Sequence, residues 1–202
     1  MQTSIKQMTP SEELWNCLTQ LNIAEAKAME LRTDWLETAR DKQLQPQTDH
    51  YIWMILAGRG WGKTRTGAQD IVLYALRNPN SQCAVVAPTA GDLRRVCLGG
   101  SSGILSIVPK ECYLVSPDQK GYSSSTTEMR LYNGSKITGY AASEPDRLRG
   151  PQFHRAWCDE VAAWRYPEAF DQLMFGLRLG EKPQCIITTT PKPSKLIKDL
   201  FS

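Results

Sequence analysis

Residues 51–66 read YIWMILAGRGWGKTRT and carry the strongest structural signal in this chain. The segment up to Leu56 is aromatic and branched, which is typical of a buried parallel strand. The glycines that follow permit the tight turns of a phosphate-binding loop, and a helix that starts at such a loop directs its N-terminal amides at the anion. The stretch therefore predicts a strand, a loop that binds ATP, and a helix.

The side chains of the loop have distinct expected roles. Lys63 is expected to contact the β- and γ-phosphates, and the Thr64 hydroxyl is expected to ligate Mg²⁺. Arg59 lies between glycines, where it can stabilise charge on the phosphates in the transition state. The rings of Trp61 and Trp157 are assigned no role beyond packing, although Trp61 counts among the loop residues around the nucleotide. The remaining predicted nucleotide-contacting residues are Gly58, Gly60, Trp61, Gly62 and Arg65.

The loop departs from the common phosphate-loop pattern at its first position. Alanine stands at position 57, where glycine is usual, and the residues from there read A-x-x-G-x-G-K-T. This variant is similar to motif I of helicases and of viral DNA-packaging motors. A glycine-rich turn without a ligand is the alternative, but Gly-Lys-Thr directly after an apolar strand favours the phosphate loop.

An acid pair forms the second chemical element. Asp159 and Glu160 come directly after Ala156-Trp157-Cys158, at the expected end of a strand. We assign Asp159 to Mg²⁺ and Glu160 to the general base that polarises the attacking water. An Asp-Glu pair alone is more often a solvated turn, but its place downstream of the Gly-Lys-Thr run favours catalysis.

A run of threonines forms the third element. Thr188, Thr189 and Thr190 follow an apolar strand and precede a proline. Their hydroxyls can sense the γ-phosphate through the catalytic acid and relay its loss to the rest of the domain. A plain strand end is the alternative, and the position behind the other two elements favours the coupling role.

Helix and strand patterns alternate along the chain. Thr9-Pro10-Ser11-Glu12 predicts a helix start, and a second helix is expected over about Ile23–Ala39. We expect strands over 83–87, 153–158 and 184–188, helices over 63–76 and 167–177, and a β-hairpin around Asn133-Gly134. The alternation predicts an α/β P-loop NTPase fold of the RecA or ASCE type, with a mainly parallel sheet flanked by helices and an inserted hairpin. Residues 1–42 are expected to form an N-terminal helical extension, and residues 43–202 the P-loop ATPase domain.

Composition sets ordinary limits on the chain. Its 202 residues can bury one sizeable core, and a net charge of +3 does not indicate nucleic-acid binding by itself. Six cysteines without a C-x-x-C pair predict reduced thiols in a cytosol. Because the start lacks the apolar core of a signal peptide and no apolar run is long enough to span a bilayer, we expect an intracellular protein with no membrane partner.

Four stretches resemble a known family: WLETARDKQLQPQTDHYIWMILAGRGWGKTRTGA, VVAPTAGDLRRV, PDRLRGPQFHRAWCDEVAAW and IITTTPKP. Their order and spacing are similar to those in the ATPase domain of the large terminase subunit of tailed bacteriophages. The resemblance covers most of the chain from Trp35 onward. It implies a motor that hydrolyses ATP to drive double-stranded DNA into a preformed capsid in the cytoplasm of the infected bacterium. It also implies a homo-oligomeric ring, pentameric in the family, that docks on the portal protein and works with the small terminase subunit.

The resemblance extends to single residues. Gln43 occupies the place of the glutamine that reads adenine, and Arg59 matches the arginine that contacts phosphates in cis. Arg149 matches the arginine that reaches a neighbouring subunit's nucleotide in trans. From the residues alone, Arg147 and Arg149 lie on a loop, where a solvated surface arginine is the alternative.

Complete large terminases resemble two-domain proteins, in which an RNase H-like nuclease follows the ATPase. Its metal-binding carboxylates lie well downstream of the threonine motif, so we expect no nuclease activity from this chain, which ends at Ser202. Two alternatives stay open: a helicase-like DNA-dependent ATPase core, and a nucleotide-binding assembly module that hydrolyses little by itself. Arg94-Arg95 and the lysines near the C-terminal end either contact DNA or belong to an ordinary surface.

Overall fold

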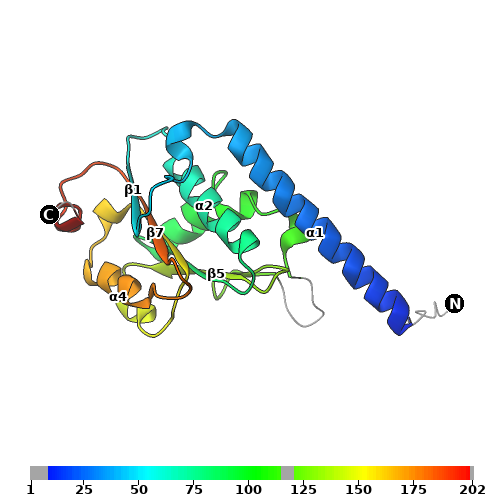
Figure 1. The fold of residues 1–202 in the computed structure, drawn as a ribbon. Coiled ribbons are helices and arrows are strands. Elements are labelled where there is room, and N and C mark those ends of the chain that lie inside the picture. The colour runs from blue at the N-terminus through cyan, green and yellow to red at the C-terminus, as the bar shows by residue number, and fades with distance from the viewer. Residues whose placement is uncertain (1–8, 115–120, 201–202) are drawn as a thin grey trace.

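A single mostly parallel sheet forms the centre of the computed structural model, which describes residues 9–114 and 121–200 (Figure 1). The strand order is β1-β7-β6-β2-β5-β4-β3. The neighbours β1, β7, β6, β2 and β5 pair in parallel, whereas β4 pairs antiparallel with β5 and with β3. The strands are β1 (Ile52–Leu56), β2 (Gln82–Ala87), β3 (Tyr122–Ser123), β4 (Glu128–Arg130), β5 (Lys136–Ala141), β6 (Arg155–Asp159) and β7 (Gln184–Thr189).

Helices and short helical turns cover both faces of this sheet. The α-helices are α1 (Pro10–Thr38), α2 (Lys63–Arg77), α3 (Ala90–Asp92), α4 (Glu168–Gly176) and α5 (Lys195–Leu200). Short helical turns are η1 (Asp41–Gln43), η2 (Leu93–Leu98, a π-helix), η3 (Ile104–Ser106), η4 (Lys110–Cys112), η5 (Pro145–Leu148) and η6 (Val161–Ala163). This confirms the predicted α/β fold. The predicted strands and the helices over 63–76 and 167–177 have boundaries within two residues of those observed.

Alternate residues of each central strand enter two different cores. On β2, Val85 packs with α2 on one face, and Val86 packs with α4 on the other face. On β6, Trp157 lies on the α2 side and Cys158 on the α4 side. Because successive side chains in a strand point to opposite faces, the sheet is buried on both sides, as a parallel sheet requires.

The predicted hairpin is present and continues the main sheet. β4 pairs antiparallel with β5, with Met129 opposite Ile137, and Gly134 in the connecting turn has φ +81°. β5 also pairs in parallel with β2 over its whole length. The Asn-Gly signal therefore marks the turn correctly, while the second hairpin strand is a central strand of the fold.

The N-terminal region forms one long helix, so the prediction of two successive helices is wrong. α1 is continuous because no proline or glycine separates Leu21 from Ile23. The predicted start is confirmed, since the Thr9 amide donates to Glu12 Oε2 at 2.8 Å and the Glu12 amide donates to Thr9 Oγ1 at 3.4 Å. The split into an extension over 1–42 and a domain over 43–202 stays a prediction.

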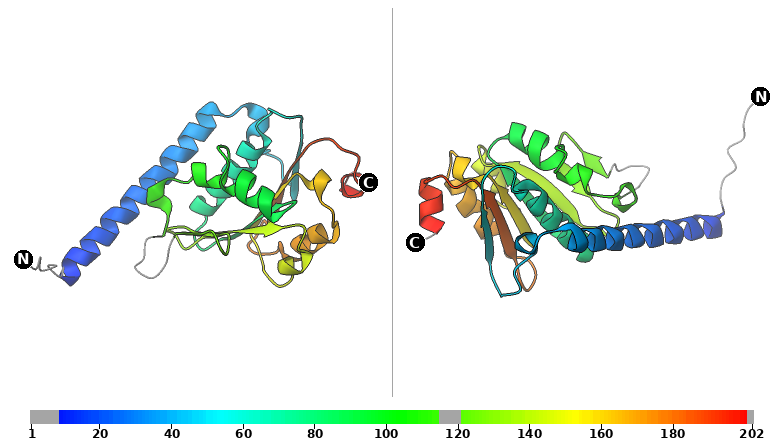
Figure 2. Two further views of the ribbon diagram at one scale, coloured as in Figure 1. Left: turned by 180° about the vertical axis from the view of Figure 1, so that it is seen from behind. Right: turned by 90° about the horizontal axis from the view of Figure 1, so that it is seen from above.

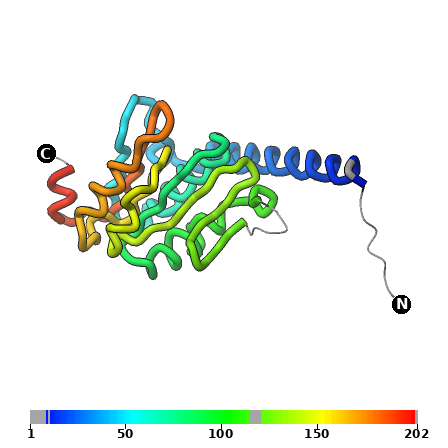
Figure 3. The backbone as a smooth tube through the Cα atoms, turned by 90° about the horizontal axis from the view of Figure 1, so that it is seen from below, coloured from blue at the N-terminus to red at the C-terminus, as the bar shows by residue number. Residues whose placement is uncertain are grey.

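Only the second half of α1 has a buried side. Ala24 is 1% exposed and its carbonyl accepts a contact from the Cys112 thiol, whereas Leu14, Leu18 and Leu21 are exposed. Figure 2 shows α1 as a straight rod that extends past the body of the molecule. Figure 3 shows that α1 extends beyond the sheet and that α5 lies at the opposite end of the molecule.

Arg155 explains why a charged residue interrupts the apolar run before the acid pair. It is 2% exposed at the start of β6, and its guanidinium binds both carboxylate oxygens of Asp70 on α2, at 2.5 and 2.8 Å. The same group lies over the ring of Tyr74. A buried charge with these partners is tolerated in the core and ties α2 to the sheet.

All six cysteines are free thiols, as predicted, and five of them are buried. Within residues 9–114 and 121–200, none of the helices combines the length and the apolar character that a bilayer crossing needs.

Candidate active site

The loop between β1 and α2 has the backbone of a phosphate cradle. Gly60 and Gly62 adopt φ +78° and +92°, which L-residues with a side chain rarely adopt. At Gly58 and Gly60, open space lies where a Cβ would stand. α2 begins directly after Gly62, so the amides of its first turn face the loop.

Lys63 is a buried cation whose ammonium is held by backbone carbonyls. Its side chain folds back, and Nζ donates to the Ala57 carbonyl at 2.7 Å and to the Gly58 carbonyl at 2.9 Å. It is 9% exposed, and it takes part in none of the ion pairs among the described residues. An ammonium in this position is suited to an anionic ligand.

Gln43 and Arg40 contact the loop and the first turn of α2. The Gln43 amide donates to Thr66 Oγ1 at 3.0 Å, and it lies 2.9 Å from the place of a Cβ at Gly62. Arg40 donates to Gln43 Oε1 at 2.9 Å and to the Trp61 carbonyl, and its guanidinium lies over the Trp61 ring. Gln43 and Thr66 also line one end of a groove of about 840 Å³ that continues along α2.

Asp159 ends β6 in a buried set of hydrogen bonds. The Thr188 hydroxyl donates to its Oδ1 at 2.8 Å, and the Cys97 thiol approaches its Oδ2 at 3.5 Å. Burial raises the pKa of the Asp159 carboxyl to about 6, although both of these contacts and the charge of Lys63 act to lower it. The lysine of the loop and the acid of β6 therefore share one site.

Glu160 leaves the strand in a strained conformation. Its φ of +48° and ψ of +47° place a residue with a side chain in the left-handed region. The Thr190 amide donates to Glu160 Oε1 at 2.9 Å, and the Thr190 hydroxyl donates to the same oxygen. Strain of this kind is found at functional sites, where surrounding contacts hold it in place.

The threonines bind the end of β7 to both acids. Parallel pairing places Thr188 opposite Asp159, and the Thr188 carbonyl accepts the Glu160 amide at 2.6 Å. Thr189 Oγ1 accepts the Ala162 amide at 3.0 Å. The predicted position of the threonine strand next to the acid strand is confirmed, and each threonine contacts the segment from Asp159 to Ala162.

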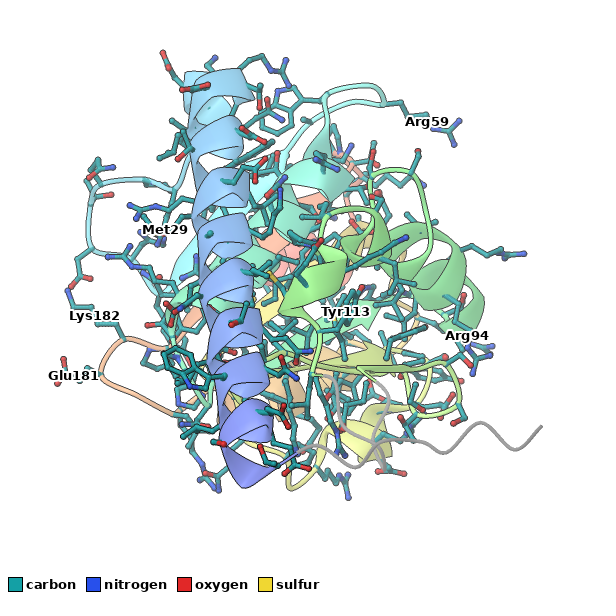
Figure 4. The ribbon with its side chains drawn as sticks, turned by 90° about the vertical axis from the view of Figure 1, so that its right-hand side faces the viewer. Met29, Arg59, Arg94, Tyr113, Glu181 and Lys182 are labelled. Carbon is teal, nitrogen blue, oxygen red and sulfur yellow. The ribbon has the colours of Figure 1, made fainter. Side chains whose placement is uncertain are left out.

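The structure does not bring every predicted residue to these acids. Arg59 is exposed, and Figure 4 shows its side chain pointing away from the body at the tip of the loop. Arg149 is 67% exposed and pairs with Asp146 at 3.3 Å. Thr64 and Arg65 are partly exposed in the first turn of α2, where burial lowers the pKa of Arg65. The roles of these residues stay predictions.

Three contacts at the site were not predicted. Arg40 supports the loop, Cys97 contacts Asp159 from η2, and the Trp157 indole donates to Thr188 Oγ1 at 2.7 Å. The expectation that Trp157 only packs is therefore incomplete. Arg40 stands three residues before Gln43, a spacing that could have suggested their contact, whereas nothing in the sequence signals the π-helix that presents Cys97.

Comparisons with known proteins give consistent results. Residues 54–202 match the family described as "Terminase large subunit, T4likevirus-type, N-terminal". No curated protein matches the chain.

Solved structures share its fold at low sequence identity. The Thermus phage P74-26 large terminase ATPase domain matches with a TM-score of 0.65 and 18% identity, over 81% of this chain and 69% of that one. The HK97 bacteriophage large terminase matches with a TM-score of 0.55 and 17% identity, over 73% and 31%.

A third structure is the large terminase of a thermophilic bacteriophage solved in complex with ADP, with a TM-score of 0.53 and 13% identity. It matches over 81% of this chain and 38% of its own length. The chain thus spans well under half of the two large terminases that are not limited to the ATPase domain. Because the family match covers most of the sequence and includes the loop, both acids and the threonines, this chain belongs to the T4-like terminase large subunit family and represents its N-terminal region.

Proposed function

We propose that this chain is the ATPase motor domain of a viral terminase large subunit, which hydrolyses ATP with Mg²⁺ to drive double-stranded DNA into a procapsid. The proposal rests on the parallel, adjacent arrangement of β1, β7 and β6. Because these strands run in the same direction, the segments that follow their carboxyl ends bring Lys63, Asp159 and Glu160 to the same end of the sheet.

The residues at this end of the sheet fit a nucleotide and a magnesium ion. The open space at Gly58 and Gly60 and the buried ammonium of Lys63 suit a polyphosphate. Among the described residues no cluster of three or more His, Cys, Asp or Glu side chains could hold a metal ion. Mg²⁺ does not need such a cluster, because it is commonly held by one or two protein oxygens together with phosphates and water. Thr64 and Asp159 would supply the protein oxygens.

Each residue has a definite task in the proposed reaction. Lys63 exchanges its bonds with the loop carbonyls for bonds to phosphate oxygens, and Arg59 adds charge from the loop tip. Glu160 accepts a proton from the attacking water as that oxygen bonds to the γ-phosphorus, and the bridging oxygen leaves with ADP. Bound Mg²⁺ neutralises negative charge on the phosphates. Gln43 is proposed to read adenine from behind the loop, where it contacts the first turn of α2.

Coupling to motion is proposed to run through the threonines. Thr190 holds the Glu160 carboxylate, and Thr188 holds the Asp159 carboxylate. Loss of the γ-phosphate would change what both acids contact, and β7 would transmit that change to the rest of the domain.

The wider assembly is proposed from family membership. In this proposal the subunits form a pentameric ring on the portal protein, work with the small terminase subunit in the host cytoplasm, and contact no membrane. Arg149 is proposed to reach the neighbouring nucleotide, which its exposed position permits. Arg94 and Arg95 are exposed and are candidates for contact with the DNA backbone.

The test of the proposal is Mg²⁺-dependent ATP turnover in wild type and in Glu160→Gln. Loss of the general base should lower turnover by about 10²- to 10⁴-fold and leave nucleotide binding in place. Glu144→Gln is the matched control, since Glu144 is an exposed carboxylate paired with Arg147 at 3.5 Å. If Glu160→Gln binds ATP and hydrolyses it at the wild-type rate, the assignment of the base is wrong.

The trans role of Arg149 is tested by mixing subunits. Arg149→Ala should be inactive alone and should recover turnover when mixed with Glu160→Gln, because each Glu160→Gln subunit offers its intact arginine to a neighbour. The specific activity of wild type should likewise rise with protein concentration. Arg147→Ala serves as the control. No recovery on mixing and a flat concentration dependence would assign Arg149 to the surface.

A further inference from the structure

Trp157 combines complete burial with a single, directed hydrogen bond. The side chain is 0% exposed in the core between β6 and α2. An indole N–H can donate and cannot accept, so the 2.7 Å contact from Trp157 Nε1 to Thr188 Oγ1 has one direction. The Thr188 oxygen is the acceptor in that bond.

This direction fixes the hydrogen of the Thr188 hydroxyl. Because the oxygen already accepts from Trp157, its own hydrogen is free to be donated. The Asp159 Oδ1 atom lies at 2.8 Å and the Cys158 carbonyl at 3.5 Å, so the carboxylate is the preferred acceptor. A chain of donors therefore runs from Trp157 through Thr188 to Asp159.

The same end of the indole also packs closely against α2. A Cβ added at Gly67, on α2, would overlap Nε1 and the adjoining ring carbons of Trp157. Residue 67 lies in the helix that begins at the phosphate loop, one turn after Lys63. The indole nitrogen end of Trp157 thus packs against the helix that follows the loop and also bonds the Thr188 hydroxyl.

We propose that Trp157 is a positioning residue, which acts through Thr188 to hold the Asp159 carboxylate in one orientation for Mg²⁺. The inference rests on the proposed function, because it takes Asp159 as a metal ligand. Second-sphere hydrogen bonds of this kind orient ligands, and their loss commonly lowers metal affinity by about 10- to 100-fold.

The proposal makes a prediction that packing alone does not. If Trp157 only fills space, any loss of metal affinity in Trp157→Phe is independent of Thr188. The losses in the two single variants should then multiply in the double variant. If Trp157 acts through Thr188, removal of the hydroxyl should make the indole irrelevant to the metal.

The experiment is a double-mutant cycle with Mn²⁺ as the probe ion. Affinity for Mn²⁺ in the presence of ADP is measured by electron paramagnetic resonance in wild type, Trp157→Phe, Thr188→Val and the double variant. We expect both single variants to bind Mn²⁺ about tenfold more weakly, with metal-free ADP affinity unchanged. We expect the double variant to be no weaker than Thr188→Val, and Thr188→Ser to bind as wild type does.

Trp164→Phe is the matched control. Trp164 is also buried, and its indole donates to the backbone carbonyl of Asp159 at 3.0 Å. Its loss removes a comparable buried donor without touching the Thr188 hydroxyl, so its effect should multiply with that of Thr188→Val.

Several outcomes overturn the inference. Wild-type affinity in Trp157→Phe, or losses that multiply in the double variant, would leave Trp157 as a packing residue. Failure of wild type itself to bind Mn²⁺ with ADP would instead overturn the proposed function.

A second measurement covers the case in which Trp157→Phe does not fold. In the ¹⁵N-labelled Thr188→Val chain, the indole N–H resonance of Trp157 should move and its solvent exchange should quicken, because its acceptor is gone. Mn²⁺ affinity should fall in this variant and return in Thr188→Ser. An unmoved resonance would contradict the inference.

Discussion

Asp159 carries a carboxyl group that burial pushes toward its neutral form. With a pKa raised to about 6 from an ordinary 3.8, the folded protein holds this proton more tightly than the unfolded chain does. In the proposed function Asp159 binds Mg²⁺ in its ionised form, so metal binding would be linked to proton release at this residue.

The first prediction is a pH dependence of stability without metal. A raised pKa makes the contribution of Asp159 full below about pH 4 and lost as pH rises through about 6, a change of about 3 kcal/mol in the free energy of unfolding. Asp159→Asn should lack this fall. Urea unfolding of both proteins between pH 4 and 7 measures the difference, and parallel curves would contradict the assigned pKa.

At the residue scale, the sequence predicts the reacting groups and misses the residues that support them. Lys63, Asp159, Glu160 and Thr188 are predicted because their residue types and order match a known reaction, and their chemical roles stay predictions. Trp157 and Cys97 were missed, because a tryptophan in a strand and a cysteine in an apolar run look like ordinary core residues. Their roles depend on which neighbour they meet, and only the folded arrangement shows that.

At the scale of elements, the close contact between α2 and β6 depends on a glycine. Gly67 allows the helix to approach the Trp157 ring, and Arg155 holds the same two elements together through Asp70. The loop before α2 and the acid strand β6 are thus placed relative to each other by packing among Gly67, Trp157, Arg155 and Asp70.

The second prediction concerns the sign of a single substitution. Gly67→Ala in an unobstructed helix would stabilise the protein by about 0.5–1 kcal/mol. Here the added methyl group meets the Trp157 ring, so we expect a loss of about 1–3 kcal/mol instead. Thermal and urea unfolding measure it, and any gain in stability would show that the helix and the ring separate easily.

Element types were predictable to the extent that local patterns determine them. The apolar strands and the Asn-Gly turn were found because periodicity and turn chemistry are local. The break expected within α1 was wrong, since no proline or glycine stands at that place to end the helix. Apart from the neighbouring places of β6 and β7, strand order could not be read from the sequence, because it depends on which strands pair across long separations.

At the scale of the whole molecule, α1 is the feature that departs most from a compact domain. The helix is 29 residues long, which corresponds to about 43 Å at 1.5 Å per residue. Leu14 and Trp15 are 61% and 71% exposed near its start, whereas Ala24 is buried. The first half therefore contributes little to the stability of the body.

The third prediction follows from this difference. Deletion of residues 1–21 should change the free energy of unfolding by less than ~1 kcal/mol and shift the melting temperature by a few degrees at most. Ala24→Gln is the contrasting variant, and we expect it to cost about 1–3 kcal/mol because it forces a polar group into a buried contact. A melting temperature that falls as far on deletion as in Ala24→Gln would contradict this reading.

The same helix carries a site for fluorescent labelling. Cys17 is the exposed cysteine of the six, and it lies in the first half of α1 while the other five are buried. A maleimide dye applied to the folded wild-type chain should therefore couple at one site, attached to a stiff helix. Energy transfer between dyes on neighbouring copies would then count and space the subunits of any assembly without an engineered thiol.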